Sequence, residues 1–249
     1  MVQVPRRTGV SGPTLIRLLA RLTDADIPES RQSLSDRLSL WLGWTDAIAL
    51  SAVLDGGPSA VPAGTRAPGN ADTQEYDRVR ATLAHAIADE RAFTVPPRQR
   101  GPVTAQAAAA DVPVEYATYR QRYLSLQQSM ETSIGKLRGR LRATLAAQAP
   151  GLAKLAMVDA IMERSLSAQE RRLLATVPTL LAGHFDRLRQ AAEAESAAQE
   201  NGAPASAAPA PVVAPWLATF RKDMRSVLLA ELDIRLQPIE GLLAALRAS

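Results

Sequence analysis

The 249-residue sequence contains no cysteine and only two histidines, His85 and His184. The absence of cysteine excludes disulfide bonds, thiolate metal ligands and a cysteine nucleophile. Neither histidine has a second histidine at the spacing of a zinc-binding helix. We therefore expect no metal, no cofactor, and a structural or solvated role for both histidines.

Long apolar runs are also missing. No stretch approaches the roughly 20 apolar residues that a membrane-spanning helix needs. The first residues, MVQVPRRTGVSGP, lack the apolar run of a secretory signal. We expect a cytoplasmic protein without a transmembrane segment.

Catalytic motifs are absent as well. The sequence has no Gly-x-Ser-x-Gly elbow and no phosphate-binding glycine loop. Asp159 and Glu163 stand one helical turn apart, as paired acids in acid–base catalysis can. Because Lys154 and Arg164 lie nearby, a solvated helix face is the better interpretation. The sequence predicts a protein that is not an enzyme.

The residues that are present favour helices. Aromatic residues make up only 4% of the chain, whereas alanine supplies 46 residues, and alanine is the strongest helix former. We predict an all-α fold, a multi-helix bundle of long amphipathic helices joined by linkers rich in proline and alanine. The expected organisation is an N-terminal helical lobe (1–93), a linker (94–112), a long-helix hairpin or bundle (113–200), a Pro/Ala linker (201–213) and a C-terminal amphipathic helix (214–249) that packs on 113–200.

Two apolar stripes carry the clearest periodicity. Each spans 29 residues in eight steps, or about 3.6 residues per step, which is the period of an ordinary α-helix. The first stripe belongs to a helix that should end at Pro150-Gly151, and the second to the last helix, from about 215 to 246. Since the stripes are equal in length, we predict that the two helices pack antiparallel, with two further helices between them. The stripes are Tyr116, Tyr119, Tyr123, Leu126, Met130, Ile134, Leu137, Leu141 and Leu145, and Leu217, Phe220, Met224, Leu228, Leu232, Leu236, Ile239, Leu243 and Leu246.

Weaker patterns predict the remaining helices. One should begin near Pro13, one should run from 32 to 54, and one from 73 to 92 with Asp72 as its N-cap. A helix over 152–166 should be followed by another whose start is a capping box of Ser167 and Glu170. Pro178 should kink the helix that begins at Ser167.

Positive charge is concentrated in one segment. The net charge of the chain is +4, and residues 113–149 hold six basic and two acidic side chains. The cluster Lys136, Arg138, Arg140 and Arg142 could bind phosphates, an anionic lipid surface or an acidic partner. Alternatively, these side chains are the solvated shoulders of a core helix. Nucleic acid is disfavoured because no aromatic residues interleave with the arginines.

Two of the three tryptophans, Trp41 and Trp44, lie three residues apart in LWLGWTDAIAL. On one continuous helix they would face the same way. They could pack in the core or form a patch that docks a partner, since tryptophan is favoured at interaction hot spots. Gly43 between them would weaken the helix.

Three strings resemble a family of proteobacterial proteins of about this length that is defined only as a domain of unknown function. They are RQSLSDRLSLWLGWTDAIAL (31–50), YRQRYLSLQQSMETSIGKLRGRLRATL (119–145) and FRKDMRSVLLAELDIRLQPIEGLLAALR (220–247). The resemblance transfers no catalytic residue. It implies an accessory of an envelope complex, because such genes often neighbour motor-stator-like membrane proteins. We expect a helical interaction protein whose partner is a second copy or a component of a membrane complex; the alternative is a protein that binds nucleic acid or an anionic surface through 113–149.

Overall fold

The structure, a computed structural model, describes residues 13–25, 33–56, 70–89, 115–200 and 214–248. Every regular element in these ranges is a helix, which confirms the all-α prediction. The elements are α1 (Thr14–Thr23), α2 (Leu34–Trp41), α3 (Trp44–Asp55), α4 (Asn70–Ala88), α5 (Tyr116–Gln148), α6 (Pro150–Leu174), α7 (Val177–Glu200) and α8 (Pro215–Ala248). The predicted linkers 94–112 and 201–213 lie outside the described residues.

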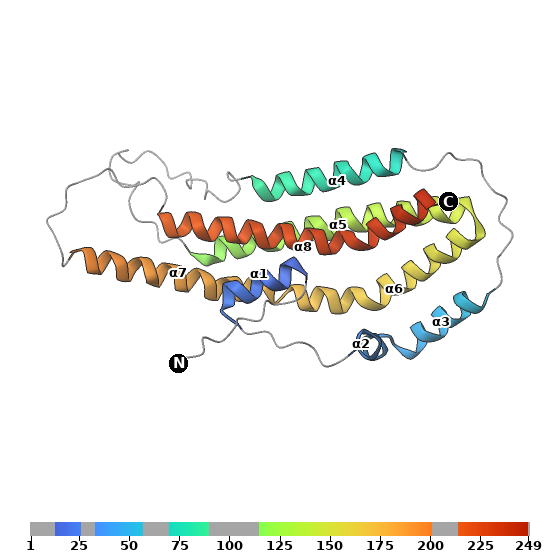
Figure 1. The fold of residues 1–249 in the computed structure, drawn as a ribbon, viewed down its shortest axis with the longest axis horizontal. Coiled ribbons are helices and arrows are strands. Elements are labelled where there is room, and N and C mark those ends of the chain that lie inside the picture. The colour runs from blue at the N-terminus through green and yellow to red at the C-terminus, as the bar shows by residue number, and fades with distance from the viewer. Residues whose placement is uncertain (1–12, 26–32, 57–69, 90–114, 201–213, 249) are drawn as a thin grey trace, which may run out of the picture.

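The long helices α5 to α8 form the body of the bundle (Figure 1). Helix α5 runs in one direction, α6 and α7 return in the other, and α8 runs alongside α5 again. The first reversal is at Ala149, whose backbone is extended, and Pro150 then takes the first position of α6. Proline suits this position because its missing N–H would have no partner there anyway. The predicted end of the helix at Pro150-Gly151 is confirmed.

Helices α5 and α8 are parallel. Near the start of both, the Tyr119 ring meets the Phe220 ring edge-on, with 5.3 Å between centroids. Further along both, Gln127 donates a hydrogen bond to Glu231 at 3.0 Å. The predicted antiparallel packing is therefore wrong. Stripes of equal length fit either direction, and α6 and α7 follow one another along a single return pass, so that α8 runs in the same direction as α5 (Figure 1).

The boundary between α6 and α7 explains two further differences between the structure and the sequence-based prediction, at Ser167 and at Pro178. Helix α6 continues through Ser167, so the predicted capping box at Ser167 is wrong. The Ser167 hydroxyl lies 3.5 Å from the Arg164 carbonyl of the same helix. The chain leaves the helix at Ala175–Thr176 instead. Pro178 thus stands in the first turn of α7, where its missing N–H breaks no helical hydrogen bond, and the predicted interior kink does not arise.

Both apolar stripes are buried as predicted, except that Tyr116 is half-buried. Along α8 the stripe is wider than predicted and also includes Val227, Ala230, Glu231 and Leu242. The same apolar cluster takes in Leu15 and Leu22 of α1 and residues of α4. The two long stripes therefore form the centre on which the shorter helices pack.

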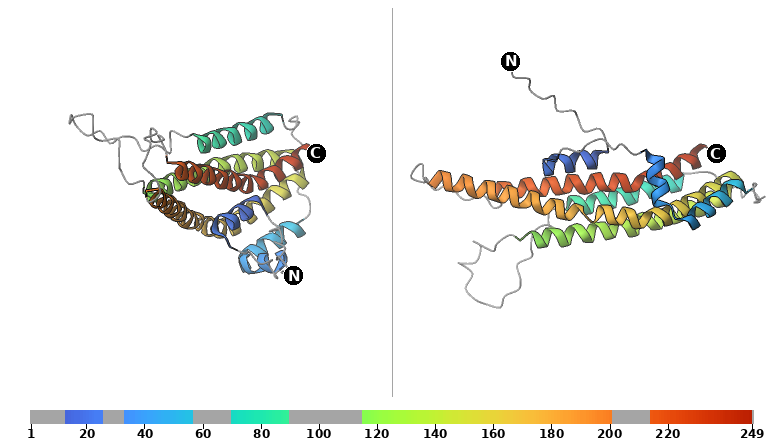
Figure 2. Two further views of the ribbon diagram at one scale, coloured as in Figure 1. Left: turned by 60° about the vertical axis from the view of Figure 1, so that its left-hand side comes forward. Right: turned by 90° about the horizontal axis from the view of Figure 1, so that it is seen from below.

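The N-terminal helices are distributed around this centre (Figure 2). Helix α1 packs on α7 and α8, α4 covers α5 and α8, and α2 and α3 pack on α6. This arrangement differs from the single N-terminal lobe predicted for 1–93, because α1 and α4 pack on α5, α7 and α8, whereas α2 and α3 pack on α6. Helix α4 begins at Asn70, so Asp72 lies in its first turn and is not the N-cap that we predicted.

The single helix predicted for 32–54 is wrong. The chain leaves the helix at Leu42 and Gly43, and the two halves meet at an angle of 115°. Among the described helices, none is by itself long and apolar enough to cross a membrane; α2 and α3 reach that threshold only when counted together, despite the bend. We call the pair α2–α3 the arm.

Candidate interaction surfaces

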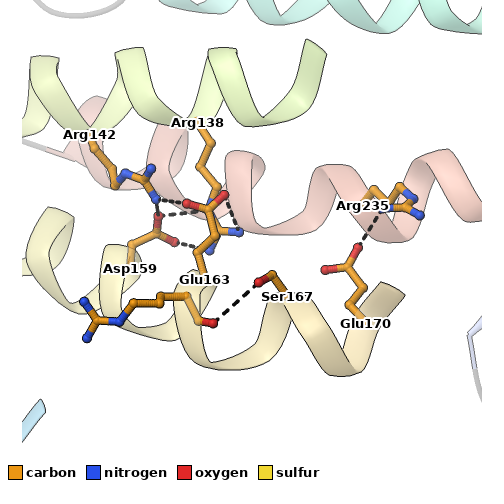
Figure 3. A network of polar contacts seen from close by, with 8 residues as sticks. Arg138, Arg142, Asp159, Glu163, Ser167, Glu170 and Arg235 are labelled. Carbon is orange, nitrogen blue, oxygen red and sulfur yellow. Dashed lines mark hydrogen bonds and ion pairs between the residues drawn. The ribbon is translucent and has the colours of Figure 1, made fainter. Parts of the chain in front are cut away.

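Two arginines of the predicted basic cluster point into the interface between α5 and α6 (Figure 3). Arg138 donates two hydrogen bonds to Asp159, at 2.9 and 2.7 Å. Arg142 donates to Asp159 at 3.2 Å and also pairs with Glu163. The Arg138 and Asp159 side chains are only 13% and 12% exposed. These arginines therefore join two helices and are not free to bind a ligand.

The other two cluster residues lie on the outside of α5. Arg140 pairs with Glu75 of α4, and this hydrogen bond lowers the pKa of the Glu75 carboxyl. Lys136 is exposed and has no partner within the part of the chain that the structure describes. Three of the four cluster residues are thus paired with carboxylates that α4 and α6 supply.

Asp159 and Glu163 were predicted to form a solvated helix face, and that interpretation is wrong. Both accept hydrogen bonds or ion pairs from Arg138 and Arg142, and Asp159 is nearly covered. Charge-assisted bidentate contacts of this kind fix geometry as well as adding energy. The carboxylates hold α6 in register with α5.

A buried polar network around Glu231 was missed by the sequence analysis. The Glu231 side chain is 0% exposed. It accepts hydrogen bonds from Tyr123 at 2.7 Å, Gln127 at 3.0 Å and Arg235 at 2.9 Å. Arg235 also reaches Glu170 of α6 at 3.0 Å (Figure 3). Burial, and then the Glu231 carboxylate, raise the pKa of Tyr123 above its ordinary value.

A sequence signal for this network exists. Glu231 follows Leu228 by three residues and precedes Arg235 by four, so an acid and a base occupy successive turns within the apolar stripe of α8. Charged side chains at such positions must be paired when buried. The network ties α5, α6 and α8 together at one level of the bundle.

The two histidines differ in burial. His184 is buried, with Nε2 2.9 Å from Asp223, and its ring lies beside Phe220. His85 is exposed on α4. Among the described residues, no group of three potential metal ligands comes together. A half-open depression of about 310 Å³ between α4 and α5 is lined by Asp72, Glu75 and their neighbours, but its carboxylates come from α4 alone.

The tryptophan pair is divided by the bend in the arm. Trp41 is the last residue of α2 and Trp44 is the first of α3, so they do not share a helix face as predicted. Trp41 is half-buried, whereas Trp44 is 81% exposed. Of the two tryptophans, Trp44 is the one whose side chain is largely exposed.

Trp44 belongs to an apolar surface on the outside of the arm. Leu40 is 73% exposed and Ile48, one turn after Trp44, is 55% exposed. We call these three residues the outer arm face. Helix α3 contributes no buried residue at all. Its other side is fixed to α6, because Asp46 pairs with Arg164 at 3.3 Å and Lys154 binds the Leu54 carbonyl.

Comparison with known proteins is consistent with the predicted resemblance. The model of the family described as "Protein of unknown function (DUF3348)" matches residues 1–248. The chain belongs to the DUF3348 family. No curated protein and no solved structure matches it. In this DUF3348 protein the outer arm face contains Trp44, which at 81% is the most exposed large apolar side chain among the described residues.

Proposed function

We propose that this DUF3348 protein is a non-enzymatic helical interaction protein that binds a protein partner through the outer arm face. The observation that carries the proposal is the exposure of Trp44, a large aromatic side chain that is 81% exposed among the described residues, with Ile48 exposed one turn further along α3 and Leu40 exposed near the end of α2. Contiguous apolar patches on a protein surface mark interaction sites more often than chance. Tryptophan is the side chain most enriched among residues that dominate binding energy.

The position of the arm supports this role. Helix α3 is held against α6 by the Asp46–Arg164 pair and by Lys154, so its outer side is presented in a fixed orientation. A preformed surface loses less entropy on binding than one that must first become ordered. Covering the exposed part of one tryptophan is worth roughly 3 kcal/mol at about 25 cal/mol per Å².

A pull-down followed by reconstitution tests the proposal. The tagged protein and a Trp44→Ser/Ile48→Ser variant are compared for the partners that they retain from cells of the native host. The matched control is Leu229→Ser, which changes a partly exposed leucine of α8. We expect the arm variant to lose a partner that the control keeps, with an unchanged melting temperature. The purified partner should then bind the variant at least about tenfold more weakly; equal binding would refute the proposal.

The second candidate, binding of nucleic acid or an anionic surface through 113–149, has less support. Only Lys136 is without a partner among the four cluster residues, within the described part of the chain, and Arg140 would have to leave Glu75. Electrostatic binding of this kind would weaken steeply with salt. A cytoplasmic location, which we expect from the sequence, and association with a membrane complex, which the family resemblance implies, belong to the proposal too.

A further inference from the structure

The sequence of α3 does not fit its exposure. In WTDAIALSAVLD only Asp46 and Asp55 are charged, and apolar residues occur all around the helix. A helix that is apolar on every side is normally buried on every side. Here one side rests on α6 and the opposite side, with Trp44 and Ile48, is exposed. Within the part of the chain that the structure describes, α3 is therefore covered on one side only.

We propose that the outer arm face is covered by a second copy of this chain, through an antiparallel contact of α3 with its counterpart about a two-fold axis. This inference rests on the proposed function and names the partner. Because of the two-fold axis, each contact occurs twice in the interface, as is usual for homodimers. Its axis passes between Ala49 and Leu50, the midpoint of the helix.

Shape favours this pairing. The outer side of α3 is bulky in its first half, at Trp44 and Ile48, and small in its second half, at Ser51 and Ala52. In the antiparallel arrangement the bulky half of one copy lies against the small half of the other, with Ile48 opposite the partner's Ser51. A parallel arrangement would instead set tryptophan against tryptophan.

Charge favours it as well. Asp55 stands in the last turn of α3, where a carboxylate is unfavourable because the helix C-terminus carries partial negative charge. It is exposed and accepts a hydrogen bond from Ser51 at 3.0 Å. The N-cap Gly43 offers no side-chain cap to the first-turn N–H groups. Antiparallel pairing brings Asp55 of each copy to that N-terminus of the other, whereas parallel pairing would bring the two carboxylates together.

The location of the arm leaves room for the second copy. Helix α3 lies outside α6 as the outermost layer on its side of the bundle (Figures 1 and 2). The two bundles would thus lie on opposite sides of the α3 pair. A contact of one helix face and Leu40 buries less than the roughly 1,200 Å² of a stable interface. We therefore expect a dimer in the micromolar range.

Sedimentation velocity over about 1 to 500 µM tests the dimer. The intact 26.6 kDa chain should approach twice that mass as concentration rises. Ile48→Asp should keep it monomeric throughout, and Asp55→Asn should weaken association several-fold, while Leu229→Ser should leave it unchanged. A monomer at every concentration overturns the inference but leaves open the proposed function, which the pull-down tests separately. A dimer that Ile48→Asp does not affect also overturns it.

Cysteine cross-linking tests the orientation, because the chain has no cysteine of its own. A cysteine at Ser51 lies close to the axis and should form an intermolecular disulfide under mild oxidation. A cysteine at Asp55 should not, since the two positions would be about 16 Å apart along the helices. Cross-linking of both variants with equal efficiency would show a parallel pair and overturn the antiparallel assignment.

Discussion

At the residue scale, the most constrained side chain is Glu231. Its carboxylate has lost all contact with water and is satisfied by Tyr123, Gln127 and Arg235, from two helices. Removing a charge from water costs several kcal/mol, which only close partners offset. The network is consequently sensitive to loss of any one member, because the remaining charge stays buried.

Replacing Glu231 should destabilise the protein far more than replacing an exposed acid of the same helix. We expect Glu231→Ala to lower the free energy of unfolding by about 3–5 kcal/mol, because Arg235 is left with Glu170 alone. The control is Asp233→Asn, which removes a 58% exposed partner of Arg80 and should cost under about 1 kcal/mol. Urea unfolding measures both, and equal losses would mean that Glu231 contributes no more than a surface charge.

At the scale of elements, the sequence identified the long helices but not how they follow one another. The periodic leucines and aromatics of α5 and α8 could be read directly, since burial imposes a 3.6-residue period. The breaks at Gly43 and Ala175 could not, because flanking residues continue the helical pattern and tertiary packing decides where the chain turns. Ion pairs such as Arg138–Asp159 were equally hidden, since their partners lie on another helix.

The Arg138–Asp159 ion pair leads to a prediction about how α5 and α6 are joined. A double-mutant cycle with Arg138→Leu and Asp159→Leu should give a coupling energy of about 1–3 kcal/mol, since the contact is bidentate and nearly covered. The same cycle at Arg80 and Asp233, which are half exposed and join α4 to α8, should give under about 0.5 kcal/mol. If the coupling energy of Arg138 and Asp159 were as small as that of Arg80 and Asp233, the arginines of α5 would not hold α5 and α6 together as we propose.

At the scale of the whole molecule, the decisive feature is the parallel alignment of α5 and α8. It follows from one return pass, made by α6 and α7 together, and it brings the starts of both long helices to the same end of the bundle (Figure 1). Helix α4 confirms the alignment independently. Its Glu75 meets Arg140 near the end of α5, and its Thr73 meets Arg247 near the end of α8.

Distances between pairs of spin labels test this alignment, and the cysteine-free sequence gives no background labelling. Labels at the exposed positions Gln121 and Lys222 mark the two helix starts, and labels at Ala143 and Ala244 mark the ends. Packed helix axes are about 10 Å apart, so both like pairs should be short. The mixed pair Gln121 and Ala244 is offset along the helices by the rise of 22 residues, about 33 Å, so its separation should be about 35 Å. Dilution with unlabelled protein separates these distances from those between two copies. A short distance for the mixed pair would mean that α5 and α8 are antiparallel after all. It would also contradict the Tyr123–Glu231 hydrogen bond, because one register of the two helices cannot give both contacts.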